Sequence, residues 1–387
     1  MDLKVALIHD WLTGMRGGER CLEVFCELFP DADLFTLLHH PGTVSPMIEK
    51  HLIRTSLIQR LPFSRRAYRY YLPIFPRAIE SFDLSGYDLV LSSSHCVAKG
   101  VRVPSNACHI SYLHTPMRYI WDQYEHYFGK GRAGRPVQSM MRFLRPRLQR
   151  WDVRSNGSVY AFIANSRHVA ERIKKYYGRT AEVIYPPVDF QAFSSSNRDD
   201  GFYLMVTAFA PYKRVDLAVE AFNRLKRPLK IVGAGQDEKR LRAIAGPTVE
   251  FLGWRPDFEI RELYASCRAL IFPGEEDFGI VPLEAMACGK PVIAYGKGGA
   301  LETVVPLRTS RPGGPKPEEA DPTGLFFYEQ TPEALIEAVR LFEAHRDRFD
   351  PVRIREHVKP FDRTNFREKI FRYVRMKHQE FSESRHA

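Results

Sequence analysis

Short apolar runs alternate with stretches of helical periodicity along most of the chain. In the first half, these runs predict buried strands at 5–9, 87–92, 107–113 and 159–164, with a short one at 183–184. In the second half, they predict strands at 202–206, 229–233, 249–252, 269–272 and 291–294. Near-continuous apolar strands joined by helices are typical of parallel sheets covered on both faces. The pattern therefore predicts an α/β protein with two successive parallel sheets.

A polar, turn-rich segment at 194–201 separates the two series of strands. We therefore predict one domain over residues 1–193 and a second over residues 200–360. The charged helical stretch at about 365–387 is expected to pack back on the first domain. Ligands of open α/β sheets bind at the carboxyl ends of the strands. We accordingly expect the binding site to lie in a cleft between the two domains.

The densest group of chemically active residues follows the predicted strand at 269–272. Three consecutive acids occupy the loop at 275–277, and Glu276 is separated by seven residues from Glu284, which lies just inside the next helix. Free amides are expected at the start of that helix, on Gly279, Ile280 and Val281. Such amides and the helix dipole favour anions, so this group suits a ligand with both hydroxyls and phosphates. The acids could also simply complement the helix dipole.

Two further segments of the second half suit a phosphate-bearing ligand. Lys213 and Arg214 occupy a strand-to-helix turn, where they can neutralise a diphosphate or form an ordinary solvated basic turn. Gly233 and Gly235 follow another strand, but Glu238 stands where a dinucleotide fingerprint requires its third glycine. This weakens a dehydrogenase interpretation. The two glycines indicate either close approach to a nucleotide or a tight turn.

In the first half, two candidate segments each follow a predicted strand, so both are expected at the same edge of the sheet. The glycine-rich loop at 14–19, with Gly17 and Gly18, follows the first strand and does not match a P-loop. His114 follows the strand at 107–113, where its ring can donate or accept a hydrogen bond. A structural role for a single histidine is the alternative.

The net charge of +11 indicates partners that carry negative charge, either phosphate-bearing ligands or a membrane surface. No zinc finger or RNA-binding motif is present, so we expect no nucleic-acid partner. The basic stretch at 132–154 contains apolar residues and suits either a packed surface helix or peripheral contact with a membrane. Pro146 is predicted to interrupt it.

No apolar run is long enough to span a bilayer, and the N-terminus lacks a signal-peptide pattern. We therefore expect a cytoplasmic protein, with peripheral contact on the inner face of the plasma membrane as a further expectation. The six cysteines form no C-x-x-C pair, which predicts buried, reduced thiols.

Taken together, these motifs resemble the retaining glycosyltransferases of family 4. The resemblance covers nearly the whole chain and rests on the Glu276/Glu284 segment, PYKRVD at 211–216, FIANS at 162–166 and HTPMRY at 114–119. It looks closest to the bacterial mannosyltransferases of O-antigen and exopolysaccharide synthesis. The resemblance implies a GT-B fold, with two Rossmann-like domains, and a nucleotide-sugar as substrate. It also implies transfer with retention of configuration, with no cofactor and no metal required.

The resemblance also implies roles for individual residues. Glu276 would contact the hydroxyls of the donor sugar, Glu284 the ribose diol, Lys213 the leaving diphosphate, and His114 the sugar from the other domain. Further donor contacts are implied for the amides of Gly279, Ile280 and Val281, and for Arg214, Gly233, Gly235, Gly17 and Gly18. One position departs from the family pattern, because Ala208 stands where many members carry an arginine. Arg214 or Arg16 would then substitute for it, or Lys213 would act alone.

The resemblance implies transfer of a hexose, mannose from GDP-mannose in the first place, onto a lipid-linked or saccharide acceptor in cell-surface polysaccharide synthesis. Two alternatives remain open at this point. The first is a sugar-nucleotide epimerase of the same fold. The second, suggested by Ala208, is a non-catalytic nucleotide-binding partner in a polysaccharide-synthesis complex.

Overall fold

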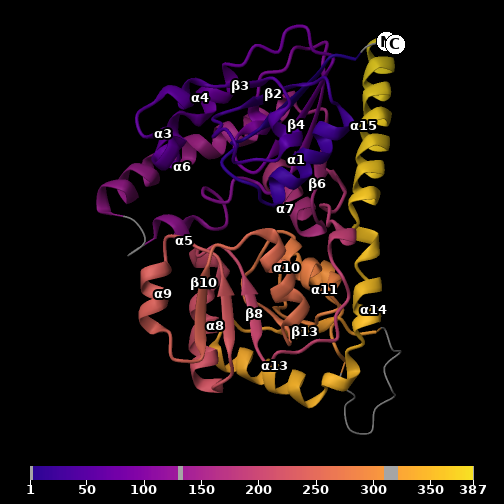
Figure 1. The fold of residues 1–387 in the computed structure, drawn as a ribbon. Helices are drawn as coiled ribbons and strands as arrows, with labels where there is room; N and C mark the ends of the chain where they lie inside the picture. Colours follow the sequence, from indigo (N-terminus) through magenta and orange to yellow (C-terminus); the bar gives the residue numbers. More distant parts are fainter. Residues whose placement is uncertain (1–2, 130–133, 309–320, 387) are drawn as a thin grey trace. The chain divides into compact units, whose positions relative to one another are not determined.

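The computed structural model describes residues 3–129, 134–308 and 321–386 (Figure 1). The chain divides into two compact units, each with its own parallel sheet. Unit 1 comprises Met1–Pro187 and Arg363–Ala387, and unit 2 comprises Val188–Asp362. This division places the polar segment at 194–201 inside unit 2. The backbone N–H of Val188 donates to the carbonyl of Phe361, which ties the start of unit 2 to its end.

Unit 1 contains a seven-stranded parallel sheet in the order β3-β2-β1-β4-β5-β6-β7. Its strands are β1 (Val5–His9), β2 (Asp33–Thr36), β3 (Ile53–Thr55), β4 (Leu89–Ser94), β5 (Cys108–Leu113), β6 (Ala161–Ala164) and β7 (Ala181–Val183). Its helices are α1 (Gly17–Leu28), α2 (Pro46–Glu49), α3 (Ser64–Ala67), α4 (Phe75–Glu80), α5 (Tyr124–Phe128), α6 (Arg135–Arg154), α7 (Arg167–Tyr177) and α15 (Arg363–His386). Every residue of β1, β4 and β5 is buried, as expected for strands covered on both faces.

Helix α15 packs on unit 1 through an apolar face. Phe366 stacks on Phe25 of α1 with ring centroids 6.0 Å apart, and it shares a buried cluster with Ile370 and Val374. Arg363, the first residue of α15, forms ion pairs with Glu23 and Glu27 of α1.

Unit 2 contains a six-stranded parallel sheet in the order β10-β9-β8-β11-β12-β13. Its strands are β8 (Tyr203–Val206), β9 (Leu229–Val232), β10 (Val249–Gly253), β11 (Leu270–Phe272), β12 (Val292–Tyr295) and β13 (Gly324–Phe327). Its helices are α8 (Val215–Leu225), α9 (Glu238–Ile244), α10 (Asp257–Ser266), α11 (Ile280–Ala287), α12 (Ala300–Thr303), α13 (Pro332–Ala344) and α14 (Pro351–Glu356). The predicted α/β class with two parallel sheets is confirmed.

The prediction that Pro146 interrupts the basic stretch is wrong, because α6 runs from Arg135 through Pro146 to Arg154. A proline inside a helix removes one hydrogen bond and costs about 3 kcal/mol. Packing on both sides of Pro146 offsets this cost, since Met141, Leu148 and Trp151 of α6 are all buried.

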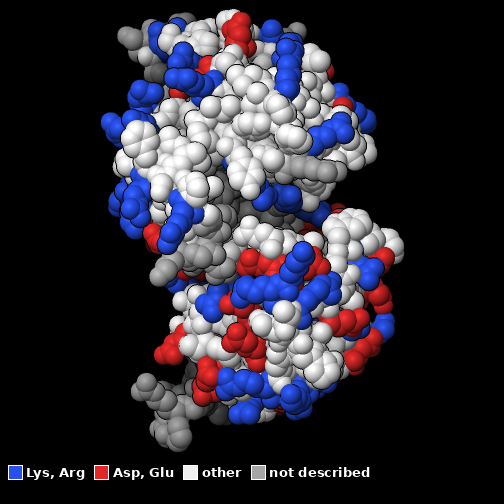
Figure 2. Space-filling view, turned by 90° about the vertical axis from the view of Figure 1, so that its left-hand side faces the viewer, with Lys and Arg blue, Asp and Glu red and all other residues white. Residues whose placement is uncertain are grey.

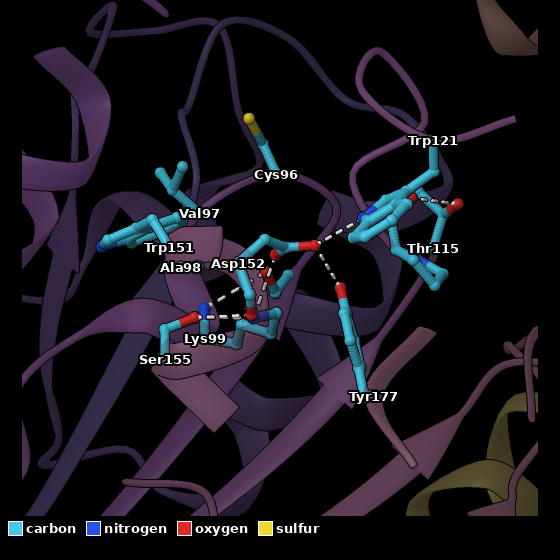
Figure 3. Close-up of polar contacts among 12 residues, drawn as sticks. Cys96, Val97, Ala98, Lys99, Thr115, Trp121, Trp151, Asp152, Ser155 and Tyr177 are labelled. Carbon is cyan, nitrogen blue, oxygen red and sulfur yellow. Dashed lines mark hydrogen bonds and ion pairs between the residues drawn. The ribbon is translucent and has the colours of Figure 1, made fainter. Parts of the chain in front are cut away.

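A buried ion pair anchors the end of α6 (Figure 3). Lys99 Nζ lies 3.0 Å from Asp152 Oδ1, and it also donates to the Asp152 carbonyl at 2.6 Å and to Ser155 Oγ at 2.7 Å. The other carboxylate oxygen of Asp152 accepts from Trp121 Nε1 at 2.7 Å and from the Tyr177 hydroxyl at 2.8 Å. Burial lowers the pKa of Lys99, and the charge of Asp152 opposes that shift. Each buried charge is therefore stabilised by the other, and removing one would leave the other without its partner of opposite charge.

The six cysteines are free and buried, which confirms the prediction of reduced thiols. Burial raises the pKa of Cys26 and of Cys108 to about 12 in each case. Among the described residues, no helix combines the length and apolar character needed to cross a membrane.

Candidate active site

In unit 2, the loop between β11 and α11 is shaped by a glycine at the start of the helix. Gly279 has a φ of +91°, a region that disfavours residues with a side chain, and a Cβ there would lie 3.1 Å from the ring of Phe272. Gly279 stands directly before α11, so the first amides of the helix, on Ile280 and Val281, come at the end of the loop that follows β11.

The central contact of this loop is an ion pair between the two residues that sequence analysis singled out. Lys213 Nζ lies 2.5 Å from Glu276 Oε1, and the side chains are only 15% and 19% exposed. Lys213 follows β8 and Glu276 follows β11, which are neighbouring strands. The parallel sheet therefore brings together two residues that are far apart in sequence.

Two glycines that sequence analysis missed hold the backbone of Glu276. Gly298 pairs with Glu276 as an isolated parallel bridge, and the N–H of Gly299 donates to the Glu276 carbonyl at 2.9 Å. A Cβ on Gly298 would collide with that carbonyl oxygen, and a Cβ on Gly299 would collide with Phe278. Only glycine fits at either position. The one sequence signal was a pair of glycines after a predicted strand.

The turn that carries Lys213 packs closely against the acidic loop. A Cβ on Gly274 would lie 2.9 Å from the carbonyl oxygen of Tyr212, so the missing side chain permits this approach. The next residue, Arg214, is 3.4 Å from both Asp216 Oδ1 and Gln330 Oε1. Gln330 in turn donates to the Pro273 carbonyl at 2.9 Å, which links Arg214 to the start of the same loop.

Glu284 lies on α11, where its Oε2 accepts a hydrogen bond of 2.9 Å from the hydroxyl of Tyr264. Tyr264 is fully buried, and burial, followed by the charge of Glu284, raises its pKa well above the ordinary value. The tyrosine therefore stays a hydrogen-bond donor and fixes one oxygen of the carboxylate.

The structure gives Gly233 and Gly235 a packing role. A Cβ on Gly233 would collide with the Thr207 carbonyl, and a Cβ on Gly235 would lie 2.6 Å from the Phe209 carbonyl oxygen. The backbone that lies close against these glycines therefore belongs to the loop that follows β8. Ala208, in that same loop, is exposed and brings no charge.

In unit 1, His114 lies in a cluster of polar groups at the carboxyl ends of β1, β4 and β5. His114 Nε2 is 2.9 Å from Ser93 Oγ, and His9 Nδ1 is 3.0 Å from the same oxygen. Gly18, at the start of α1, lies against both rings, since its Cβ position would be 3.6 Å from each. Glu19 Oε1 is 3.7 Å from His9 Nε2. Gly17 is the first residue of α1 and comes directly before Gly18 in the sequence.

Sequence analysis predicted His114 and the glycine loop that ends at Glu19, but it missed His9 and Ser93. It also missed Asp10, whose buried carboxylate accepts four backbone N–H groups of residues 95–98 at 2.6–2.9 Å. Polar residues at the ends of apolar strands were the available signal. Asp10 also contacts His95 Nδ1 at 3.2 Å, and burial lowers the pKa of His95 to about 3, so this imidazole is neutral.

Two family models match the chain, and together they span most of it. "Glycosyl transferases group 1" matches residues 189–357, and "Glycosyltransferase Family 4" matches residues 16–192.

Curated relatives show similarity over shorter stretches. An uncharacterized glycosyltransferase of Methanocaldococcus jannaschii is 31% identical over 148 residues, which is 37% of this chain and 42% of the relative. A GDP-mannose-dependent alpha-mannosyltransferase of Mycobacterium tuberculosis is 38% identical over 134 residues, or 32% of this chain and 35% of the relative. The O-antigen chain mannosyltransferase C of Escherichia coli is 30% identical over 155 residues, or 35% and 42%. The matched region thus spans less than half the length of these relatives.

Solved structures share the fold over nearly the whole chain. Anabaena Alr3699/HepE in complex with UDP and glucose has a TM-score of 0.68 at 19% identity, covering 96% of this chain and 99% of that one. Sucrose-phosphate synthase of Thermosynechococcus elongatus has a TM-score of 0.71 at 19% identity, covering 97% and 98%. With both halves matched by family models and the two-sheet fold shared, the chain belongs to the family 4 glycosyltransferases of the GT-B fold.

Proposed function

We propose that the protein transfers a hexose from a nucleotide-sugar to a lipid-linked or saccharide acceptor, with retention of configuration, in cell-surface polysaccharide synthesis. The observation that carries this proposal is the Lys213–Glu276 ion pair beside the start of α11, at the carboxyl ends of β8 and β11. We propose mannose from GDP-mannose as the donor, because relatives from M. tuberculosis and Mycolicibacterium smegmatis are named GDP-mannose-dependent mannosyltransferases. Uridine nucleotides are the competing donors, since a solved structure of the same fold contains UDP.

The ion pair suits the charge changes of glycosyl transfer. Negative charge grows on the diphosphate as the bond to the sugar breaks, and a fixed cation near that charge lowers the barrier. Lys213 supplies this cation, and Arg214, held by Gln330, supplies a second positive charge. We therefore propose that the reaction requires no metal and no cofactor. Glu276 oxygens accept hydrogen bonds from sugar hydroxyls, and the amides of Ile280 and Val281 hold phosphate or sugar oxygens.

Glu284 is proposed to accept from the ribose diol of the nucleotide. Tyr264 donates to Oε2 of this carboxylate, and that hydrogen bond holds this oxygen in place. In unit 1, we propose that His114 contacts the transferred sugar and that Gly17 and Gly18 bring the α1 backbone close to it.

A surface of unit 1 suits an acceptor that is anchored in a membrane. Helix α6 exposes five arginines and three apolar side chains, namely Arg135, Arg142, Arg147, Arg150 and Arg154 with Met140, Phe143 and Val153. Its one acid, Asp152, is buried. Figure 2 views this side of unit 1 and shows Lys and Arg spread among uncharged residues, with few acids. We propose that this surface contacts the anionic inner face of the plasma membrane peripherally.

The proposal is tested by incubating the purified protein with GDP-mannose or UDP-glucose and a lipid-linked acceptor. Glu276→Ala should abolish transfer while the far-UV circular dichroism stays unchanged. The matched control is Glu275→Ala, which lies in the same loop but pairs with Lys297 at the surface, and it should retain activity. Full transfer by Glu276→Ala would overturn the assignment. Donor turnover without acceptor would indicate an epimerase, and donor binding without turnover would indicate a non-catalytic partner.

A further inference from the structure

Two residues that directly follow β6 reach the loop that carries His114. Asn165 is the first residue after the strand, and Ser166, next to it, is the N-cap of α7. Strand β6 pairs in parallel with β5, so the loops after both strands lie at the same edge of the sheet. Asn165 is 6% exposed and Ser166 is fully buried, so both side chains need hydrogen-bond partners within unit 1.

The side chains of these two residues form a hydrogen-bonded chain whose direction is set at both ends by backbone groups. The backbone N–H of Val169 donates to Ser166 Oγ at 3.0 Å, and the Ser166 hydroxyl donates to Asn165 Oδ1 at 3.1 Å. Asn165 Nδ2 then donates to the carbonyl oxygen of His114 at 3.0 Å. Because a carbonyl only accepts, turning the amide of Asn165 over would place two acceptors against each other.

The bond from Asn165 completes the support of the His114 backbone. The N–H of His114 donates to the Ser94 carbonyl at 2.8 Å, and Asn165 holds the carbonyl on the other side of the same Cα. With both peptide groups held, the direction of the side chain is held too, and the ring Nε2 lies 2.9 Å from Ser93 Oγ. Since a hydrogen bond weakens steeply away from its best geometry, a rotation of the His114 carbonyl would take the ring away from Ser93.

We propose that Asn165 is a positioning residue for His114: its amide fixes the His114 carbonyl and, through it, the direction in which the imidazole points. An asparagine suits this place because it offers a donor to the carbonyl and an acceptor to Ser166 on one short side chain. Arg172 Nη1 donates to Thr115 Oγ1 at 2.8 Å, so the loop stays anchored at the next residue when the bond from Asn165 is lost. The effect of losing it is therefore local to His114.

The consequence for catalysis rests on the proposed function, in which His114 contacts the transferred sugar. A group that is misplaced by about 1 Å can cost about 100-fold in rate. Because the proposed contacts to the diphosphate and the ribose lie in unit 2, the KM for the donor should change little when Asn165 is replaced. The loss should fall on kcat, which we expect to drop about ten- to hundredfold.

Asn165→Leu removes the donor while keeping the size of the side chain, because two methyl groups take the places of the amide oxygen and nitrogen. If this variant does not fold, Asn165→Ala removes the same donor with a smaller side chain. The matched control is Asn156→Leu, since Asn156 is 5% exposed and precedes β6, at the other end of the same strand. The control should keep the kcat of the wild type.

A double-mutant cycle separates positioning from a general loss of structure. If Asn165 acts through His114, Asn165→Leu should lower kcat in the wild type but cause no further loss in a His114→Ala background. Losses that multiply in the double variant would show that Asn165 acts independently of His114 and would overturn the proposal.

Crystal structures of the wild type and of the folded Asn165 variant test the position of the ring without an assay. We expect the distance from His114 Nε2 to Ser93 Oγ to exceed about 3.5 Å in the variant, beyond hydrogen-bond reach. A ring that keeps its wild-type contact with Ser93 in the variant contradicts the proposal. If the wild type transfers no sugar, the proposed function fails, whereas the two crystal structures still decide whether Asn165 positions His114.

Discussion

Replacing Lys99 by methionine tests the buried ion pair at the end of α6. The substitution keeps the length of the side chain but removes its charge and its donors. Asp152 keeps the hydrogen bonds from Trp121 and Tyr177 but loses the cation 3.0 Å from its other oxygen, in a place that water does not reach (Figure 3).

The size of the effect follows from burial. Lys99 is 1% exposed and Asp152 is fully buried, so solvent cannot screen the charge that remains. Removing one partner of a buried pair costs about 3–5 kcal/mol. In a unit of roughly 200 residues, each kcal/mol shifts the melting temperature by about 2–4 °C, so Lys99→Met should lower the melting temperature of unit 1 by about 6–20 °C.

Urea unfolding followed by tryptophan fluorescence measures this loss. Trp121 and Trp151 lie beside the ion pair and report on unit 1. Adding Asp152→Asn to Lys99→Met removes the stranded charge but keeps an acceptor for Trp121 and Tyr177. The double variant should therefore be more stable than Lys99→Met alone.

The matched control is Lys377→Met on α15, which removes a surface pair with Glu380 and should change stability by less than about 0.5 kcal/mol. If Lys99→Met unfolds as the control does, the buried charge of Asp152 is compensated in some other way, and the argument from burial fails.

Three further predictions concern the loop of Glu276, the acid stability of unit 2 and the α6 surface. Gly298→Ala should lower transfer at least about tenfold, because the new Cβ would collide with the Glu276 carbonyl. The control is Gly253→Ala, since Gly253 has a similar positive φ but open space around its Cβ position. That variant should lose only about 1–2 kcal/mol of stability. Burial raises the pKa of Glu343, but hydrogen bonds from Arg227 and Tyr203 outweigh it, so the net shift is downward. Glu343 therefore adds stability at pH values above the ordinary glutamate value, and that stability is lost as the pH falls through the lowered pKa. Glu343→Gln should flatten the acid dependence of urea unfolding, and an unchanged dependence contradicts this. The wild-type chain should sediment with vesicles containing anionic lipid and be released by salt. The double variant Arg142→Glu/Arg147→Glu should bind these vesicles several-fold less. Equal binding of the wild-type chain to neutral vesicles would contradict membrane contact through the arginines of α6.

The sequence alone determined the fold class and identified the charged residues of the candidate site in unit 2. Strands buried on both faces need apolar residues at nearly every position, so the run at 5–9 identified β1 without reference to the rest of the chain. The spacing of Glu276 and Glu284 was equally local, because one short loop and one helix connect them. Strands β2, β3 and β13 were missed. Strand β3, for example, is a three-residue edge strand with no buried residue, so it carries almost no apolar pattern.

Tertiary structure decided which distant residues meet. His9 and Ser93 are 84 positions apart and are joined only because β4 pairs with β1. Gly298 supports Glu276 because β12 lies beside β11, and the glycine pair after β12 does not by itself indicate which loop it contacts. Pro146 stays within a helix because buried contacts on both sides outweigh a local penalty. Periodicity records what a segment needs locally, whereas strand order and close packing depend on the whole chain.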